Sequence, residues 1–194
     1  MFCDVEYRTR DDEGGGYPGT CNDIRLAYDY LLNIVSRVIP FDPLRIIIMG
    51  HSAGGMLALW LSCQRLVKCR LVVGIAPCAD LIEGVKCKLG DDGTAVLRFM
   101  KCDYKSSLKS YKDASPSENL PLPISQLIVS GGRDVDVPAS YISRYIKKCN
   151  HSFVGGSSSS VEYLHFEDAD HYDLTSSSHE VSVNTILSKV MKYI

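Results

Sequence analysis

The sequence predicts an α/β fold in which a mostly parallel sheet carries helices on both faces. Short apolar runs alternate with segments of helical spacing, which is typical of such sheets. Two of the runs, RIIIMG and RLVVGIAP, are almost wholly apolar, as expected for strands that are buried on both sides. The chain has 194 residues, of which 45% are hydrophobic, and this suits a single domain over residues 1–194.

Five segments are expected to form strands because they are short, apolar and rich in Val, Ile, Leu, Tyr or Phe. They are residues 2–7, 45–49, 70–76, 124–130 and 161–166. The spacing of apolar residues predicts a helix over residues 22–38. A second, strongly apolar helix is expected over residues 53–66, where it begins at a glycine-rich turn.

The long stretch of residues 80–122 is less regular. It contains KLGDDG, two expected short helices and the proline-marked turn SPSENLPLP. This stretch could be a cap over a pocket, or a surface insertion without a function of its own. The run GGSSSS at residues 155–160 is expected to be a flexible connector.

Composition argues against several function classes. A formal net charge of -2 gives no sign of a basic surface for nucleic acid or an anionic membrane, so we expect a small molecule as the partner. No apolar run reaches the roughly 20 residues that span a bilayer, and the start, MFCDVEYRTR, lacks the pattern of a signal peptide. We therefore expect a cytoplasmic protein, and homo-oligomer formation stays open.

The eight cysteines are scattered and form no CxxC pair, so we expect reduced thiols, no metal and no cofactor.

Gly50-His51-Ser52-Ala53-Gly54 fits the pattern GxSxG between an expected strand and an expected helix. In that setting the serine sits at a tight, strained turn, and the two glycines let the neighbouring backbone pass without a clash. The following helix aims N–H groups at developing negative charge, which makes the Ala53 N–H the natural oxyanion donor.

The simpler interpretation of this GxSxG segment is a plain glycine-rich turn without a catalytic role. A phosphate-binding loop is disfavoured, because no GK[ST] follows and the next strand lacks the acidic residue that binds a ribose.

A serine hydroxyl is a weak nucleophile that needs a base, and the base needs a carboxylate to hold its tautomer. Behind a GxSxG turn the chain order is serine, then acid, then histidine. Asp134 follows the expected strand 124–130 and His171 follows the expected strand 161–166, so both are predicted at the sheet edge that carries Ser52. These three residues are the candidate nucleophile, acid and base.

Other residues compete for these roles. Asp136 lies close enough in sequence to replace Asp134 as the acid, and the histidine could be flanked by Asp168, Asp170 or Asp173. Position at the strand end favours Asp134. The remaining histidines fit less well, because His51 adjoins the serine and cannot easily face its Oγ, and the others lie inside a strand or in polar segments: His165, His151 and His179.

Taken together, these segments resemble one branch of the α/β-hydrolases, which includes acetyl-esterase-like, feruloyl-esterase-like and arylformamidase (kynurenine formamidase)-like enzymes. The matching segments are VEYRTRDDEGGGYPGTCNDIRLAYDYL, RIIIMGHSAGGMLALWL, VVGIAPCADL, ASPSENLPLPISQLIVSGGRDVDVPASYISRYI and FEDADHYDL. The resemblance implies that the aspartate of DxxVP and the histidine of DH complete a triad with Ser52, and these are Asp134 and His171. It also matches Tyr7-Arg8 to the YR at the end of the family's fourth strand.

One departure concerns the HGG-type loop that follows the third strand of such enzymes and supplies a second oxyanion N–H. This chain shows no counterpart, and in the family the third strand lies between the fourth and the fifth. We therefore expect a chain that is truncated relative to the family, or a strand over residues 2–7 that moves across to pair with residues 45–49. An open ladder would otherwise leave buried N–H and C=O groups unpaired.

The expected function is that of a serine hydrolase that cleaves a small carboxylic ester or an aryl amide through an acyl-enzyme on Ser52. The alternative is a weakly active or non-catalytic fragment that acts as a binding module. An oxyanion donor contributes a factor of roughly 10² to 10³ in rate, so losing one weakens catalysis without abolishing it.

Overall fold

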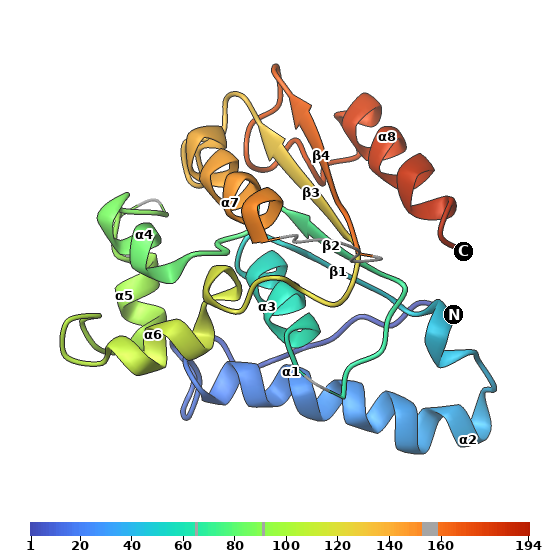
Figure 1. Ribbon diagram of the computed structural model, residues 1–194. Helices are drawn as coiled ribbons and strands as arrows, with labels where there is room; N and C mark the ends of the chain where they lie inside the picture. Colours follow the sequence, from blue (N-terminus) through green and yellow to red (C-terminus); the bar gives the residue numbers. More distant parts are fainter. Residues whose placement is uncertain (65, 91, 153–158) are drawn as a thin grey trace.

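The computed structural model describes residues 1–194 except 65, 91 and 153–158, and it contains a four-stranded parallel sheet (Figure 1). The strands lie in the order β1 (Ile47–His51), β2 (Leu71–Ile75), β3 (Gln126–Gly131) and β4 (Val161–Phe166). All three neighbouring pairs are parallel, so the carboxyl ends of the four strands lie at the same edge of the sheet. The predicted α/β class and four of the five predicted strands are confirmed.

The two central strands form the middle of the core. Every residue of β2 and β3 is buried, whereas β1 and β4 are partly exposed. This is the pattern expected of a parallel sheet that is covered on both faces at its centre. Of the two runs expected to be buried on both sides, RLVVGIAP forms the fully buried β2, whereas RIIIMG forms β1, which lies at the edge of the sheet and is only partly buried.

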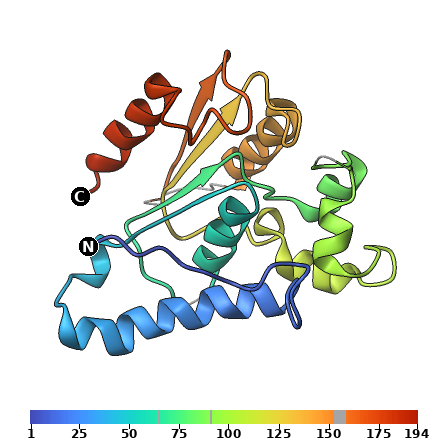
Figure 2. The ribbon, with the colours of Figure 1, turned by 180° about the vertical axis from the view of Figure 1, so that it is seen from behind.

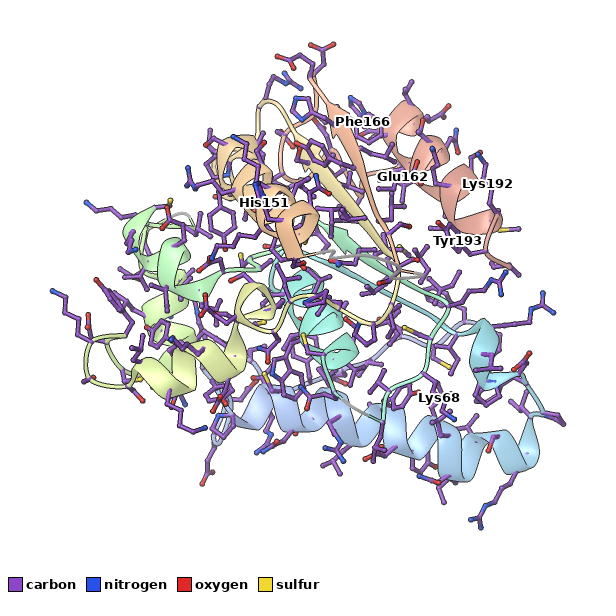
Figure 3. The ribbon with its side chains drawn as sticks, in the orientation of Figure 1. Lys68, His151, Glu162, Phe166, Lys192 and Tyr193 are labelled. Atoms are coloured by element: carbon purple, nitrogen blue, oxygen red, sulfur yellow. The ribbon has the colours of Figure 1, made fainter. Side chains whose placement is uncertain are left out.

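Helices lie on both faces of the sheet (Figures 1 and 2). Gln126 of β3 and Val161 of β4 are register partners and share one face, where the Tyr145 hydroxyl of α7 (Ala139–Ser152) donates to the Gln126 amide oxygen at 2.7 Å. Glu162 points to the opposite face, toward α8 (Glu180–Met191) (Figure 3). There it pairs with Lys189 of that helix. Helix α7 therefore covers the first face and α8 the second.

Helix α3 (Ala53–Ser62) packs against β1 and β2, and eight of its residues are buried. The predicted helix at residues 22–38 is divided into three parts: α1 (Gly19–Tyr30), the π-helix η1 (Leu31–Val35) and α2 (Ser36–Val38). A short 3₁₀ turn, η2 (Pro43–Arg45), then leads into β1. Helix α1 lies against α3 rather than directly on the sheet.

The predicted strand at residues 2–7 is wrong, because this segment has no strand structure and all but its last residue are exposed. It therefore does not move across to pair with residues 45–49, and within the described residues β1 pairs with β2 alone. The segment is instead fixed at its end by Arg8, whose guanidinium and backbone N–H both donate to the Asp23 carboxylate of α1. Strand-like composition alone therefore does not make a strand, because the segment must also pair with a neighbouring strand.

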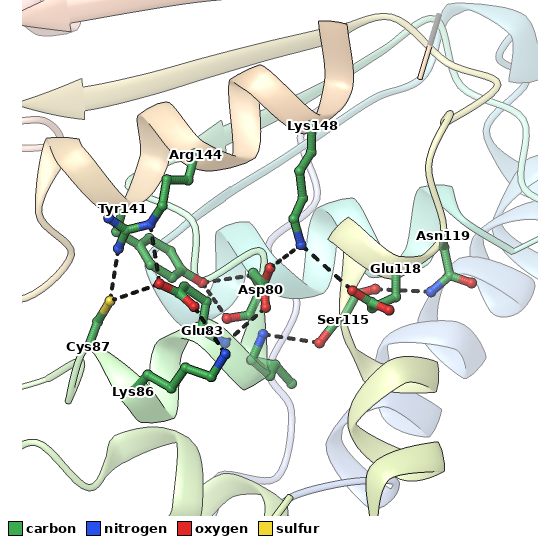
Figure 4. A network of polar contacts seen from close by, with 11 residues as sticks. Asp80, Glu83, Lys86, Cys87, Ser115, Glu118, Asn119, Tyr141, Arg144 and Lys148 are labelled. Atoms are coloured by element: carbon green, nitrogen blue, oxygen red, sulfur yellow. Dashed lines mark hydrogen bonds and ion pairs between the residues drawn. The ribbon is translucent and has the colours of Figure 1, made fainter. Parts of the chain in front are cut away.

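The less regular stretch of residues 80–122 folds into three short helices instead of the expected two, followed by a 3₁₀ turn. They are α4 (Leu81–Lys86), α5 (Ala95–Met100), α6 (Leu108–Ala114) and η3 (Pro116–Glu118). A polar network ties this stretch to α7 (Figure 4). Lys148 Nζ lies 2.6 Å from the Asp80 carboxylate and 3.7 Å from that of Glu118, and the Tyr141 hydroxyl donates to the Asp80 carbonyl.

The expected connector at residues 155–160 lies mostly outside the described residues. Among the described residues, no helix combines the length and apolar character that a membrane span requires.

Candidate active site

The three predicted site residues follow the carboxyl ends of three parallel strands. Ser52 comes directly after β1, Asp134 comes three residues after β3, and His171 comes five residues after β4. Because the strands are parallel, all three lie at one edge of the sheet. The sheet thus gathers residues that are up to 119 positions apart in the sequence.

Ser52 has the strained backbone expected of a nucleophile elbow. Its φ is 56° and its ψ is -118°, a conformation that costs a residue with a side chain about 1 to 3 kcal/mol. The turn is held by the Ser52 N–H, which donates to the Ile75 carbonyl of β2 at 2.8 Å. Such strain persists only where the surrounding structure fixes it, and it is typical of functional sites.

The elbow is tight at Gly50 and Gly55. A Cβ on Gly50 would lie 2.1 Å from the Gly54 carbonyl oxygen, and one on Gly55 would lie 3.0 Å from the Gly50 carbonyl oxygen. At Gly54 itself the same Cβ would meet only the Tyr7 hydroxyl, at 3.8 Å. The close approach predicted for both glycines of GxSxG therefore applies to Gly50, and the second crowded position is one residue beyond the motif.

Asp134 and His171 form a buried hydrogen-bonded pair. The His171 Nδ1 donates to Asp134 Oδ2 at 2.7 Å, and both residues are 5% exposed. The other carboxylate oxygen, Oδ1, accepts the backbone N–H groups of Asp136 and Val137 at 3.0 and 2.8 Å. The ring is therefore held in the tautomer that leaves Nε2 unprotonated when His171 is neutral, which is the form a general base needs.

The environment of His171 favours its protonated form. Burial alone would lower the pKa of the ring, but the hydrogen bond and charge of Asp134, together with the charges of Asp136 and Asp170, raise this pKa above its ordinary value of 6.5. A raised pKa means that these groups stabilise the imidazolium, which is the form that a base takes after it accepts a proton. The site is thus arranged to hold positive charge on His171.

The loops that carry the acid and the histidine are joined to each other. Arg133 Nη2 lies 3.1 Å from the Asp173 carboxylate, and the Arg133 N–H donates to the Ala169 carbonyl at 3.0 Å. The Asp170 carboxylate accepts the N–H groups of Tyr172 and Asp173, which fixes the turn that contains His171. Asp170 and Asp173, considered as flanking acids in the sequence, therefore organise the backbone around the ring.

In the described part of the chain, no hydrogen bond joins the Ser52 hydroxyl to the His171 ring. The two loops are connected through His51, whose Nε2 donates to the His171 carbonyl oxygen at 2.9 Å, and the two rings lie 4.5 Å apart between centroids. Sequence reasoning set His51 aside because it cannot face the Ser52 hydroxyl. It missed that a residue at the end of β1 can contact the loop after β4 at the common sheet edge.

Ala53 is the first residue of α3, so its N–H has no acceptor inside the helix. This N–H and those of the next residues lie where the helix dipole is positive. The predicted oxyanion donor is therefore at a helix end that suits negative charge.

Three side chains at the site could in principle ligate a metal: Asp134, Asp136 and His171 offer atoms within 4.8 Å of one another. The geometry favours the hydrogen-bonded pair, because the Asp134 oxygen that faces the ring already accepts the Nδ1 proton.

A surface cavity of about 470 Å³ lies elsewhere, lined by residues such as Tyr28 of α1 and Gln64 and Val67 beyond α3. Helix α3 starts at the elbow and rises about 15 Å over its ten residues, so this cavity lies beyond the far end of the helix.

Comparison with known proteins assigns the chain to a family. The family model described as the prolyl oligopeptidase family matches residues 20–194. The chain belongs to the prolyl oligopeptidase family. Members of the prolyl oligopeptidase family are serine hydrolases, and the parallel sheet with its helices is the α/β-hydrolase-like fold of the peptidase neighbours. Comparison with curated proteins finds no match.

Solved structures share the fold at low sequence identity. A puromycin hydrolase matches with a TM-score of 0.71 and 19% identity, over 90% of this chain and 25% of that chain. Dipeptidyl peptidase 4 of Porphyromonas gingivalis matches with a TM-score of 0.67 and 18% identity, over 90% and 23%. The acylaminoacyl peptidase of Pyrococcus horikoshii matches with a TM-score of 0.65 and 17% identity, over 84% and 26%. The chain therefore spans about a quarter of the length of these proteins.

The resemblance to the α/β-hydrolases is thus confirmed at the level of the superfamily. The matching model is that of the prolyl oligopeptidase family, and membership of the esterase and arylformamidase branch stays a prediction.

Proposed function

We propose that this chain is a serine hydrolase that forms an acyl-enzyme on Ser52. In this proposal His171 takes the proton from the Ser52 hydroxyl, Oγ attacks the carbonyl carbon of the substrate, and the resulting oxyanion accepts the Ala53 N–H. His171 then gives its proton to the leaving group as the carbonyl reforms. Water repeats the sequence in the second half-reaction, with His171 again as base and then as acid.

The observation that carries this proposal is the hydrogen bond between Asp134 and His171. A buried carboxylate at 2.7 Å from Nδ1, with its second oxygen held by two backbone N–H groups, orients the ring and stabilises its charged form. The elbow conformation of Ser52 at the same sheet edge adds a nucleophile in the appropriate setting. A merely structural pair would not require a strained serine beside it.

The ring of His171 must come closer to the Ser52 hydroxyl during the reaction than it is in this structure. Catalytic hydrogen bonds are often long before substrate binds and tighten in the reactive complex. We expect a small movement of the Ser52 side chain or of the His171 loop to complete the contact.

For the substrate, we propose a small carboxylic ester or an aryl amide. Three solved structures of similar fold are named as a puromycin hydrolase and as peptidases, which supports an amide as well as an ester. The stretch of residues 80–122 contacts the acid loop, because the Gly90 N–H donates to the Asp136 carbonyl at 3.2 Å. We propose that this stretch borders the entrance for the substrate as a cap.

The test is labelling of the full chain with a fluorophosphonate probe, followed by turnover of p-nitrophenyl acetate and of an aminoacyl p-nitroanilide. We expect Ser52→Ala to abolish labelling while the far-UV circular dichroism stays unchanged. Labelling that persists in Ser52→Ala would refute the assignment of the nucleophile. Turnover of the ester alone, or of the anilide as well, decides which substrate class is correct.

A second candidate function is that of a binding module without catalysis. It is favoured by the absence of a hydrogen bond between the Ser52 hydroxyl and the His171 ring among the described residues. In that case the chain would fold and bind small acyl compounds, but the probe would not label Ser52.

A further inference from the structure

His51 lies between the nucleophile elbow and the loop that carries His171. It is the last residue of β1 and directly precedes Ser52. Its Nε2 donates to the backbone carbonyl of His171 at 2.9 Å, and its ring lies against the His171 ring, with the planes at 43°. One side chain thus holds both the backbone and the ring of the predicted base.

The His171 loop needs such an attachment. Residues 167–175 contain turns but no helix or strand, so the loop is positioned by individual contacts. Contacts with Arg133 and Asp134 connect the His171 loop to the end of β3. Strand β3 lies on the other side of β2 from the elbow. His51 supplies the tie to β1, the strand that leads directly into Ser52.

We propose that His51 is a positioning residue, which anchors His171 to the nucleophile elbow and sets the distance between the base and Ser52. This inference rests on the proposed serine hydrolase function. Misplacement of a reacting group by about 1 Å can cost roughly 10²-fold in rate, so an anchor at this point is worth a measurable factor.

The charge state of His51 fits the role. Burial lowers its pKa below the ordinary value of 6.5, and the charge of the neighbouring His171 lowers this pKa further, while the hydrogen bond to the His171 backbone and the charge of Asp134 partly oppose the change. The neutral ring carries one N–H, and the carbonyl oxygen of His171 fixes that proton on Nε2. A neutral His51 leaves the positive charge of the pair to His171, which is where a general base needs it.

Two substitutions separate the hydrogen bond from the ring contact. His51→Gln keeps an amide N–H close to the position of Nε2 but removes the ring, whereas His51→Phe keeps a ring and removes the donor. If the hydrogen bond is the anchor, the rate constant for fluorophosphonate labelling falls by about tenfold or more in His51→Phe and by less than about threefold in His51→Gln, as for other residues that orient a functional side chain.

Amide hydrogen exchange in residues 167–174 measures the same anchor without any need for activity. We expect faster exchange there in His51→Phe but not in His51→Gln, with unchanged exchange in β2 and β3 as the control for folding. Unchanged exchange in His51→Phe, equal loss of labelling in both variants, or full labelling of His51→Phe would each overturn the proposal. If the parent chain is not labelled, the proposed function fails, and the exchange data alone still decide whether His51 anchors the loop.

Discussion

The carboxylate of Asp134 faces His171 with one oxygen and the backbone of its own loop with the other. Oδ2 lies 2.7 Å from the His171 Nδ1, and Oδ1 accepts the N–H groups of Asp136 and Val137. An amide in place of the carboxylate could satisfy only part of this arrangement, because its NH₂ group cannot accept a proton from Nδ1.

Asp134→Asn is therefore expected to reverse the tautomer of His171 while the fold is retained. With its oxygen on the backbone N–H groups, the new amide places NH₂ against Nδ1, and the neutral ring then carries its proton on Nε2, where a base should accept one. We expect the labelling rate of Ser52 to fall by roughly 10⁴-fold, the magnitude seen when a triad aspartate is replaced in this way.

The matched control is Asp168→Asn, which removes an exposed carboxylate from the loop that carries His171. We expect its labelling rate to stay within about twofold of the parent, since surface substitutions rarely change a site. A comparable loss in both variants would mean that loop charge, and not the contact with Asp134, governs the rate.

The pH dependence of labelling should report the raised pKa of His171. The base works in its neutral form, so the rate should fall as the pH drops through a midpoint above 6.5. Asp170→Asn removes one of the charges that raise this pKa, and it keeps a side-chain oxygen for the Tyr172 and Asp173 N–H groups. Its midpoint should lie at lower pH than that of the parent, and a midpoint that moves upward would contradict this electrostatic explanation.

Sequence patterns predicted the sheet because its central strands are buried on both faces. The run that became β2 is almost wholly apolar, as a strand buried on both faces requires, and parallel strands then bring Ser52, Asp134 and His171 to one edge. Their position at strand ends, together with their order in the chain, is what favoured them over the other acids and histidines.

Contacts between loops could not be predicted in the same way. The bond from His51 to the His171 carbonyl depends on where the loop after β4 turns, and nothing in the pattern of apolar residues determines that. Residues 2–7 have strand-like alternation, but a strand also requires a partner, which the sequence pattern does not specify. The π-helix Leu31–Val35 continues the apolar stripe of α1, so periodicity alone could not distinguish it from an α-helix.

Gly50→Ala should strongly destabilise the protein. The added Cβ would lie 2.1 Å from the Gly54 carbonyl oxygen, and neither atom can move away easily because the elbow fixes the backbone to which both are attached. Overpacking of this kind costs about 1 to 3 kcal/mol or more. The measurement is the urea midpoint of unfolding, with an unchanged slope as evidence that the mechanism of unfolding is the same.

Gly54→Ala is the matched control for this prediction. It adds the same methyl group inside the first turn of α3, where only the Tyr7 hydroxyl lies near, at 3.8 Å. Alanine is favoured over glycine in a helix by up to about 1 kcal/mol, so we expect unchanged or slightly raised stability. A Gly54→Ala variant as unstable as Gly50→Ala would show that the elbow is crowded on both sides.

The outer edge of β1 is expected to promote self-association. Within the described residues this strand pairs only with β2, and its Met49 side chain is 43% exposed. An unpaired strand edge with apolar side chains is a template for pairing with a second chain, and a lysine on the strand opposes such pairing. Sedimentation velocity over a range of concentrations should therefore show association of the parent chain that Met49→Lys reduces.

Met191→Lys separates protection of the strand edge from a general effect of charge. Met191 lies on α8, is 63% exposed and receives the same lysine. Each substitution changes the formal net charge from -2 to -1, which by itself weakens the repulsion between chains. A reduction of association in Met49→Lys alone must then arise at the strand. Equal behaviour of the two variants, or a parent chain that stays monomeric at every concentration, would show that the edge of β1 is already protected in solution.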